Sequence, residues 1–360
     1  MSTKYLNKIS SVDKANGTIT IESGVKYGDF AEELHQQGYA LHNLASLPHI
    51  TVAGACATAT HGSGINNGNL ATAVVAIELV TPEGETKQID RTHPDFNAIV
   101  VGLGAFGLIT KLTLEVQDTF DVRQDVFLDL PLSSLESNFE EIVSSGYSVS
   151  LFTDWLDEKI SEVWIKRRLD QPIEDLGTAF FGAKAATRSV HPIVAMSAES
   201  CTEQMGEAGA WYERLPHFKM GFVPSVGNEL QSEYFIPRTN AVEAILALEN
   251  LKDQIAPVLL ISEIRFVAAD SFWMSPCYNQ ECIALHFTWK QLTEEVLDVL
   301  PKIESALRPF NVKPHWGKLF TIDPKELQSR YQKYPDFIAL AGKYDPKGKF
   351  KNAFLTRNLY

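Results

Sequence analysis

The sequence of 360 residues is poor in the features that mark a secreted or membrane-bound protein. It has only four cysteines, none of them in CxxC spacing, so we expect reduced, structural thiols. It has neither an apolar signal-peptide core near the first residues nor an apolar run that could cross a bilayer. The sequence therefore predicts a cytoplasmic protein without a transmembrane segment. The cysteines are Cys56, Cys201, Cys277 and Cys282.

Basic runs and metal-binding spacings are also missing. The 32 Lys and Arg residues are outnumbered by 45 Asp and Glu residues, and the formal net charge is -13. No cluster of basic residues is long enough to follow a phosphate backbone, so nucleic acid is excluded as a partner. The nine histidines form no HxxxH pair, and we predict no metal site.

The remaining composition, 45 % hydrophobic and 21 % charged, is typical of a globular protein with room for two domains. The first part alternates strand and helix. Strands are predicted in "GTITIESG", at residues 74–80 and in "LITKLTLEV", with a hairpin from residues 74–80 through "TPEGE" into "TKQID". Helices are predicted over residues 94–100 and in "GDFAEELHQQG", where Phe30, Ala31 and Leu34 form one apolar stripe.

From about residue 120 the pattern changes to strands followed by helices. "YSVSLFTDW" and "SEVWIKRR" predict paired antiparallel strands, and residues 170–230 are poorly patterned, as in a long excursion or an insertion. A helix is then predicted in "NAVEAILALENLKDQI", strands in "VLLISEIRFV" and "CIALHFTW", and a helix in "TEEVLDVLPKIESAL". The tail "PDFIALAGKYDPKGKFKNAF" has one short helix and a Pro/Gly break. This order indicates an α+β second domain.

Residues 102–107, "GLGAFG", match the GxGxxG motif of dinucleotide-binding domains. In such domains a helix follows the glycines and its N-terminus receives the pyrophosphate. Here the strand "LITKLTLEV" follows, and the match lies about a hundred residues into the chain, whereas the first βαβ unit should lie near its start. We therefore reject a nicotinamide dehydrogenase, and expect Gly102 and Gly104 to let a turn pack closely against its neighbour.

Two predicted strands carry polar pairs where apolar residues belong. Glu263 and Arg265 share one face of "VLLISEIRFV", and His286 and Thr288 share one face of "CIALHFTW". If both strands lie in one sheet, these side chains form a patch of donors and acceptors suited to a polyhydroxy compound. The alternative is a solvated sheet face with an incidental ion pair worth under about 1 kcal/mol.

"KPHWGKLF" sets Lys318 beside a tryptophan and a glycine. It predicts either an exposed basic loop anchored by Trp316, or a lysine that enters a pocket, where desolvation would make it a stronger acid. For His49 and His61 the sequence favours core or capping roles over ligand roles. Both lie in the segment "LASLPHITVAGACATATHGSG", residues 44–64, whose small residues predict a large non-protein group against its backbone.

This segment, together with "SEIR", "LHFTW" and "PHWGK", resembles the alditol and xylitol oxidase branch of the vanillyl-alcohol-oxidase flavoprotein family over essentially the whole chain. The resemblance implies an α+β fold with two domains. A vanillyl-alcohol-oxidase-type, or PCMH-type, FAD-binding domain is expected at residues 1–118, completed by residues 325–360. An α+β substrate or cap domain with an antiparallel sheet, of the sugar-lactone or alditol oxidase type, is expected at residues 119–324.

The resemblance also implies the site. In the family the small-residue segment passes along FAD, which implies cofactor contacts at Ser46, Thr51, Gly54, Ala55, Cys56, Ala57 and Ile109. The implied polyol-binding residues are Ser46, Glu263, Arg265, His286, Thr288 and Lys318.

The implied reaction is hydride transfer from a terminal CH–OH group to flavin N5, followed by reduction of O2 to hydrogen peroxide. Lys318 and Arg265 are the expected catalytic cations, because they can stabilise the charges that develop. Glu263 would anchor hydroxyls and orient Arg265.

One family feature is absent. The FAD domain of the family normally begins with a lobe whose Gly-Ser-Gly-His-Ser loop wraps the pyrophosphate and provides the histidine that attaches the flavin covalently. No such loop occurs here, since "THGSGINNG" belongs to a later motif. We expect a truncated or misplaced start, an uncovered apolar face and poor solubility. Weak noncovalent FAD binding, or a flavin-free polyol-binding remnant, are the alternatives, and a sugar-lactone oxidase is the alternative enzyme.

Overall fold

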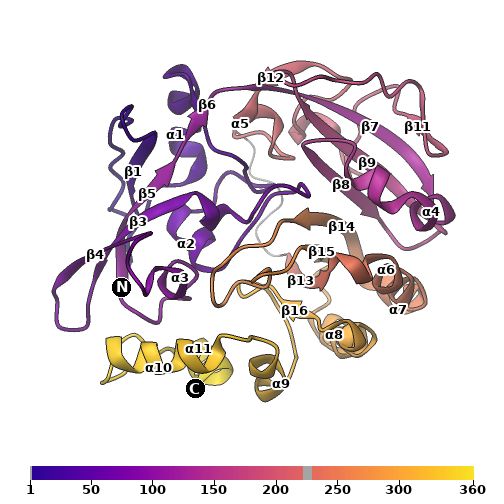
Figure 1. Cartoon of the computed structure of the whole chain (residues 1–360). Helices are drawn as coiled ribbons and strands as arrows, with labels where there is room; N and C mark the ends of the chain where they lie inside the picture. Colours follow the sequence, from indigo (N-terminus) through magenta and orange to yellow (C-terminus); the bar gives the residue numbers. More distant parts are fainter. Residues whose placement is uncertain (1, 222–228) are drawn as a thin grey trace.

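The computed structural model describes residues 2–221 and 229–360. Figure 1 shows two antiparallel sheets side by side, the smaller built from the first part of the chain and the larger from the middle part. The smaller sheet has four strands in the order β1-β5-β3-β4. The elements of this part are β1 (Thr18–Glu22), α1 (Tyr27–Gln36), β2 (Tyr39–Ala40), α2 (Val52–Ala57), β3 (Val74–Val80), β4 (Thr86–Asp90), α3 (Phe96–Ile99), β5 (Leu108–Glu115) and β6 (Gln117–Asp118).

The local predictions for this part are confirmed. Phe30, Ala31 and Leu34 are the buried stripe of α1, and β3 and β4 form the predicted hairpin. The glycine motif leads directly into β5 and not into a helix. A Cβ on Gly102 would lie 2.5 Å from the Ile99 carbonyl oxygen, so this turn packs closely on α3, as expected of a structural glycine.

The larger sheet has ten described strands in the order β10-β11-β7-β9-β8-β14-β15-β13-β16, with β12 paired to β7. The predicted pair "YSVSLFTDW" and "SEVWIKRR" is confirmed as β8 and β9. The elements are β7 (Asp121–Pro131), α4 (Leu132–Val143), β8 (Ser148–Thr153), β9 (Lys159–Arg168), β10 (Ala179–Phe180), β11 (Ala183–Ala185), β12 (Ala208–Ala210), α5 (Trp211–Arg214), β13 (Leu230–Pro237), α6 (Ala241–Glu249), α7 (Lys252–Ile255), β14 (Leu259–Val267), β15 (Cys282–Trp289), α8 (Thr293–Leu307) and β16 (Lys313–Pro314).

The poorly patterned region 170–230 is a long excursion along the edge of this sheet. Its short strands β10, β11 and β12 extend the sheet beside β7, which the sequence pattern did not predict because each has only two or three residues. Residues 222–228 of the region lie outside the described part. The single helix predicted from residue 240 divides into α6 and α7.

Helices cover one face of the larger sheet and leave the other face to the site. Helix α6 contacts α4, α8 and β13, and the hydroxyl of Tyr234 in β13 donates to Glu304 of α8 at 2.9 Å. Because successive side chains of a strand point to opposite faces, Glu233 points away from these helices. The opposite face of β13, β14 and β15 is therefore turned toward the first part of the chain.

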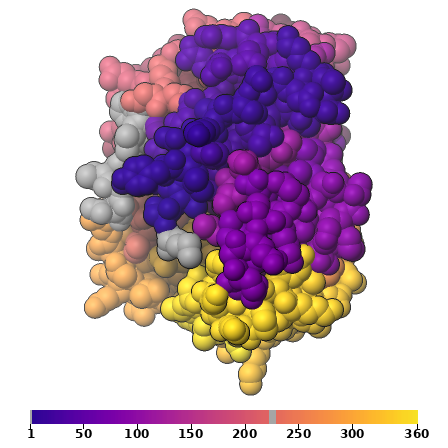
Figure 2. Space-filling model, turned by 90° about the vertical axis from the view of Figure 1, so that its left-hand side faces the viewer, coloured from indigo at the N-terminus to yellow at the C-terminus, as the bar shows by residue number. Residues whose placement is uncertain are grey.

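The C-terminal helices α9 (Pro324–Ser329), α10 (Tyr334–Tyr344) and α11 (Ala353–Leu359) lie against the first part, as Figure 2 shows with the yellow tail beside purple residues. Phe106 stacks edge-on against Phe337 and Tyr344, and the Tyr344 hydroxyl donates to Asp95 at 2.9 Å. Helix α10 is the predicted tail helix, whereas α11, capped by the Asn352 side chain, was not predicted. The domain boundaries themselves remain predictions.

No helix within residues 2–221 or 229–360 combines the length and the apolarity that a membrane crossing needs. All four cysteines are buried and free, which agrees with the expectation of structural thiols.

Candidate active site

A cavity of about 660 Å³ lies between the small-residue segment and the larger sheet. Its volume is within the range of roughly 300 to 1,000 Å³ that small-molecule sites occupy. Most of the site residues implied by the resemblance line it: Ser46, Thr51, Gly54, Ala55, Glu263, Arg265, His286, Thr288 and Lys318.

Three of the expected cofactor residues do not line the cavity. The Cys56 sulfur is buried and lies 3.8 Å from the Tyr27 hydroxyl, Ala57 ends α2, and Ile109 lies in β5 of the smaller sheet. Their contacts with FAD remain predictions.

The strand register explains how the polar wall forms. His286 of β15 pairs with Glu263 of β14 on one side and with Glu233 of β13 on the other, so the three side chains form a row across the sheet. Gln231 of β13 pairs with Thr288 in the same way. The prediction that the two polar pairs share one sheet face is therefore confirmed, and the alternative of a solvated face is wrong, because all of these residues except Gln231 are buried.

Glu233 is the centre of this wall, and the sequence reasoning missed it. Its Oε1 lies 2.6 Å from Arg265 Nη2 and its Oε2 lies 2.8 Å from Lys318 Nζ. Burial raises the pKa of its carboxyl, but the positive charges of Lys318 and Arg265 outweigh this effect and hold that pKa well below its ordinary value. Glu233 is therefore a buried carboxylate between two cations.

Lys318 enters the cavity, so the exposed-loop interpretation is wrong. Trp316 anchors its turn, since the indole is buried and donates to the Met274 carbonyl at 2.7 Å. Burial lowers the pKa of Lys318, and the neighbouring Glu233 partly offsets this. Lys318 Nζ also lies 2.7 Å from His286 Nδ1. Because an ammonium only donates, His286 accepts at Nδ1 and carries its proton on Nε2, which donates to the Thr288 hydroxyl at 3.1 Å.

Of the two histidines in the small-residue segment, only one has the expected structural role. His49 Nε2 contacts the Met220 carbonyl at 2.8 Å and lies outside the cavity lining. His61 lines the cavity, and its buried Nε2 lies 3.2 Å from Glu233 Oε1 without a well-aligned hydrogen bond. The prediction of a core or capping role for His61 was wrong, because the segment folds back onto the larger sheet.

Backbone bonds join the two walls of the cavity. The Gly64 amide donates to the Phe266 carbonyl at 2.9 Å, and the Phe266 amide donates to the Ser63 hydroxyl at 3.2 Å. Arg265 Nη1 donates to the His61 carbonyl at 3.1 Å and approaches the Ser46 hydroxyl at 3.4 Å. Arg265 thus contacts the predicted cofactor segment and the predicted substrate wall together.

Comparisons with known proteins agree with this arrangement. A family model described as FAD binding domain matches residues 1–90, and one described as D-arabinono-1,4-lactone oxidase matches residues 225–358. Alditol oxidase from Streptomyces sp. (strain IKD472 / FERM P-14339) is 47 % identical over 346 residues, which cover 96 % of this chain and 82 % of that protein. L-gulono-1,4-lactone dehydrogenase from Mycobacterium tuberculosis is 26 % identical over 367 residues, 98 % of this chain and 84 % of that protein.

Solved structures share the fold at low sequence identity. Cholesterol oxidase from B. sterolicum superposes with a TM-score of 0.77 at 15 % identity, covering 100 % of this chain and 84 % of that chain. Carbohydrate oxidase from Microdochium nivale gives a TM-score of 0.72 at 12 % identity, covering 99 % and 82 %. The predicted α+β flavoprotein fold is confirmed. Since nearly half of the aligned residues are shared with the Streptomyces enzyme over most of both proteins, the chain belongs to the alditol oxidase branch of the vanillyl-alcohol-oxidase flavoprotein family.

Proposed function

We propose that this chain is an FAD-dependent oxidase of polyols, which converts a terminal CH–OH group into a carbonyl while O2 is reduced to hydrogen peroxide. The observation that carries the proposal is the pairing of two unlike walls around one cavity, small residues on one side and charged residues on the other. Each hydroxyl of an alditol such as xylitol or sorbitol needs a donor and an acceptor. The residues that would bind it are Ser46, Glu263, Arg265, His286, Thr288 and Lys318.

The residues present fit FAD on the other wall. Thr51, Gly54 and Ala55 face the cavity with little side-chain bulk, so a flat ring could approach their backbone. His61 Nε2 is a buried polar atom without a hydrogen-bond partner among the described residues, and it would be satisfied by a ligand. When bound, FAD supplies the two-electron acceptor, and its reoxidation by O2 gives the peroxide. The residue that would attach FAD covalently stays unassigned.

The charged wall would bind and orient the substrate. Arg265 and Lys318 lie on opposite sides of Glu233, so each cation stays in place while it donates to a substrate oxygen. Arg265 and Lys318 would stabilise the negative charge that develops as the hydroxyl proton leaves and the hydride is transferred. Glu263, which lines the cavity beside Arg265, would accept a hydroxyl hydrogen bond.

A sugar-lactone oxidase is the second candidate. The match of residues 225–358 to the D-arabinono-1,4-lactone oxidase model favours it specifically. The higher identity to an alditol oxidase, 47 % against 26 % for the gulonolactone dehydrogenase, favours the polyol.

The test is a visible absorption spectrum of the purified chain, before and after denaturation and filtration, followed by peroxide assays. We expect a flavin spectrum, and peroxide formation with xylitol or sorbitol that exceeds the rate with L-gulono-1,4-lactone. Yellow colour that passes the filter after denaturation would indicate noncovalent FAD. A faster rate with the lactone would support the second candidate, and a protein that stays colourless with added FAD would contradict both.

A further inference from the structure

Lys166 of β9 is a buried lysine whose three ammonium protons all have acceptors. Its Nζ donates to the carbonyls of Leu215 at 2.6 Å and Pro216 at 3.0 Å, and lies 3.1 Å from His217 Nδ1. Only about 1 % of the residue is exposed. Because all three acceptors belong to one short segment, Lys166 fixes this segment against the sheet.

The ring of His217 is held in one orientation. It lies edge-on to Phe152 and to Trp164, with centroid distances of 5.4 Å and 5.2 Å. Since an ammonium cannot accept a hydrogen bond, His217 accepts from Lys166 at Nδ1, and its proton lies on Nε2. Burial and the charge of Lys166 lower the pKa of His217 to about 4, so the ring is neutral near pH 7.

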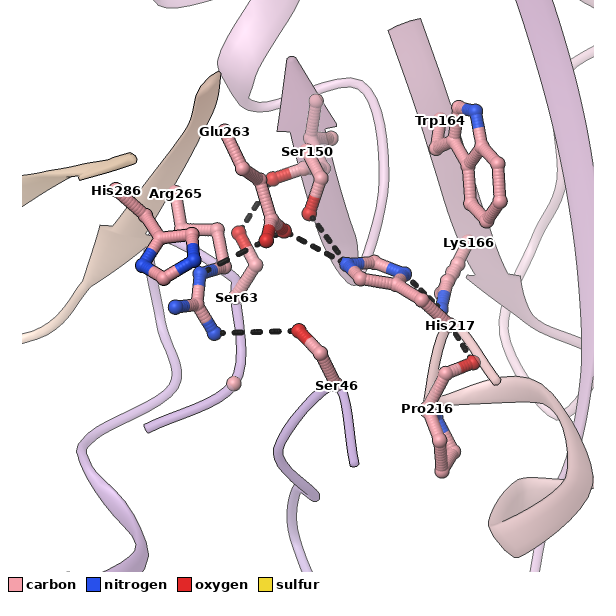
Figure 3. A network of polar contacts seen from close by, with 12 residues as sticks. Ser46, Ser63, Ser150, Trp164, Lys166, Pro216, His217, Glu263, Arg265 and His286 are labelled. Atoms are coloured by element: carbon pink, nitrogen blue, oxygen red, sulfur yellow. Dashed lines mark hydrogen bonds and ion pairs between the residues drawn. The ribbon is translucent and has the colours of Figure 1, made fainter. Parts of the chain in front are cut away.

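His217 Nε2 lies 2.7 Å from Oε1 of Glu263, to which it donates (Figure 3). Figure 3 shows the imidazole between Lys166 on one side and the carboxylate on the other. Arg265 Nε approaches the same Oε1 at 3.5 Å. Among the described residues no contact is formed by Glu263 Oε2, and Glu263 lines the cavity. The arrangement thus uses one carboxylate oxygen for support and leaves the other for a ligand.

We propose that Lys166 and His217 are positioning residues for the oxidation of polyols: Lys166 keeps the proton of His217 on Nε2, and His217 holds Glu263 so that Oε2 receives a substrate hydroxyl. The substrate half of this inference rests on the proposed function. The half that concerns the tautomer of His217 is a property of the chain alone.

Two substitutions at His217 separate its two hydrogen bonds. His217→Gln can place an amide nitrogen near the position of Nε2, so it keeps the donor to Glu263. His217→Asn can place its carbonyl oxygen near the position of Nδ1, so it keeps the acceptor for Lys166 and loses that donor. We expect His217→Asn to raise the KM for xylitol at least tenfold with a smaller change in kcat, and His217→Gln to stay within about threefold of the wild type.

A KM for His217→Asn equal to that of the wild type would overturn the positioning role. Equal losses in both variants would also overturn it, because they would indicate packing of the ring and not its donor. Dissociation constants for xylitol, measured by calorimetry, should follow the same order.

The tautomer is read by ¹⁵N NMR of protein labelled at its histidines, with His217→Gln used to assign the signal. We expect the wild type to show His217 protonated at Nε2 and not at Nδ1. Lys166→Met should change this signal and raise the KM, whereas Lys166→Gln, which keeps an N–H donor, should change it less and serves as the second variant if Lys166→Met does not fold. An unchanged signal in both Lys166 variants would overturn the role of Lys166. A wild type that neither binds nor oxidises any polyol would refute the proposed function and the substrate half, while the NMR result would still decide the role of Lys166.

Discussion

Glu233 Oε1 lies 2.6 Å from Arg265 Nη2, and this ion pair joins β13 to β14 across the intervening strand β15. With Glu263 and Lys318 the cluster contains two carboxylates and two cations, so its formal charge is balanced inside the protein. Breaking a buried pair by removing one partner is costly, because the remaining charge is left without compensation.

We therefore expect Glu233→Gln to lower the free energy of unfolding by about 3 kcal/mol or more, because two buried cations would lose their shared carboxylate. Urea unfolding at pH 7 measures this change. The control is Glu203→Gln, which removes a surface pair with Lys219 whose side chains are both nearly half exposed, and which should cost under about 1 kcal/mol. Equal losses for the two variants would contradict a central role for Glu233.

Lys318→Ala should lower kcat for polyol oxidation at least about a hundredfold, the loss typical of removing one charge-stabilising donor. The flavin content of the variant should equal that of the wild type, so that the loss can be assigned to the substrate wall. Lys325→Ala, on the exposed start of α9, is the matched control. Turnover of Lys318→Ala near the wild-type rate would remove the catalytic role of this lysine.

Glu162 provides a test of stability against pH. Burial raises the pKa of its carboxyl to about 7, while the Trp164 indole donates to it at 2.7 Å. The folded protein keeps this proton between about pH 4.5 and pH 7, where the unfolded chain has lost it, so the wild type loses stability as the pH rises through this range.

Glu162→Gln keeps an acceptor for Trp164 and cannot ionise. It should be more stable than the wild type by up to about 3 kcal/mol at pH 8, with a difference that shrinks toward pH 4.5. Denaturant unfolding at the two pH values measures this. A difference independent of pH would mean that Glu162 does not titrate in this way.

His315 should act in the opposite range of pH. Burial lowers the pKa of its imidazole to about 3, against an ordinary value of 6.5, so the unfolded chain gains a proton first as the pH falls. The free energy of unfolding of the wild type should therefore decrease as the pH is lowered from 6.5 toward 3. In His315→Gln this slope should be smaller by about 1.4 kcal/mol per pH unit between pH 6 and pH 4, and measurements at pH 8 control for lost packing. Parallel curves for the two proteins would refute the prediction.

The sequence predicted the face of β14 and β15 because strand alternation is a local property. Glu263 and Arg265, like His286 and Thr288, are two residues apart, and no tertiary contact is needed to see that they point the same way. The same signal was present in β13, where Gln231 and Glu233 are also two residues apart. It was missed because the strand follows directly on a long region without a clear pattern.

Lys166 had no comparable signal. It stands before Arg167 and Arg168 in a basic run that is typical of a solvated strand, yet it is buried while Arg168 pairs with exposed Asp170. Its burial depends on a segment about fifty residues later in the chain, which folds over it. Sequence patterns within one strand carry no information about such a contact.

The bonds between the two cavity walls also bear on how the protein folds. The Phe266 amide and the Ser63 hydroxyl are 203 residues apart in the sequence, and Arg265 and the His61 carbonyl are 204 apart. Contacts of such long range require a large loop to close first, and they form slowly. During synthesis the segment around Ser63 leaves the ribosome well before β14 exists. The charged cluster is therefore among the last parts of the molecule to assemble, and until then the small-residue segment has no partner strand.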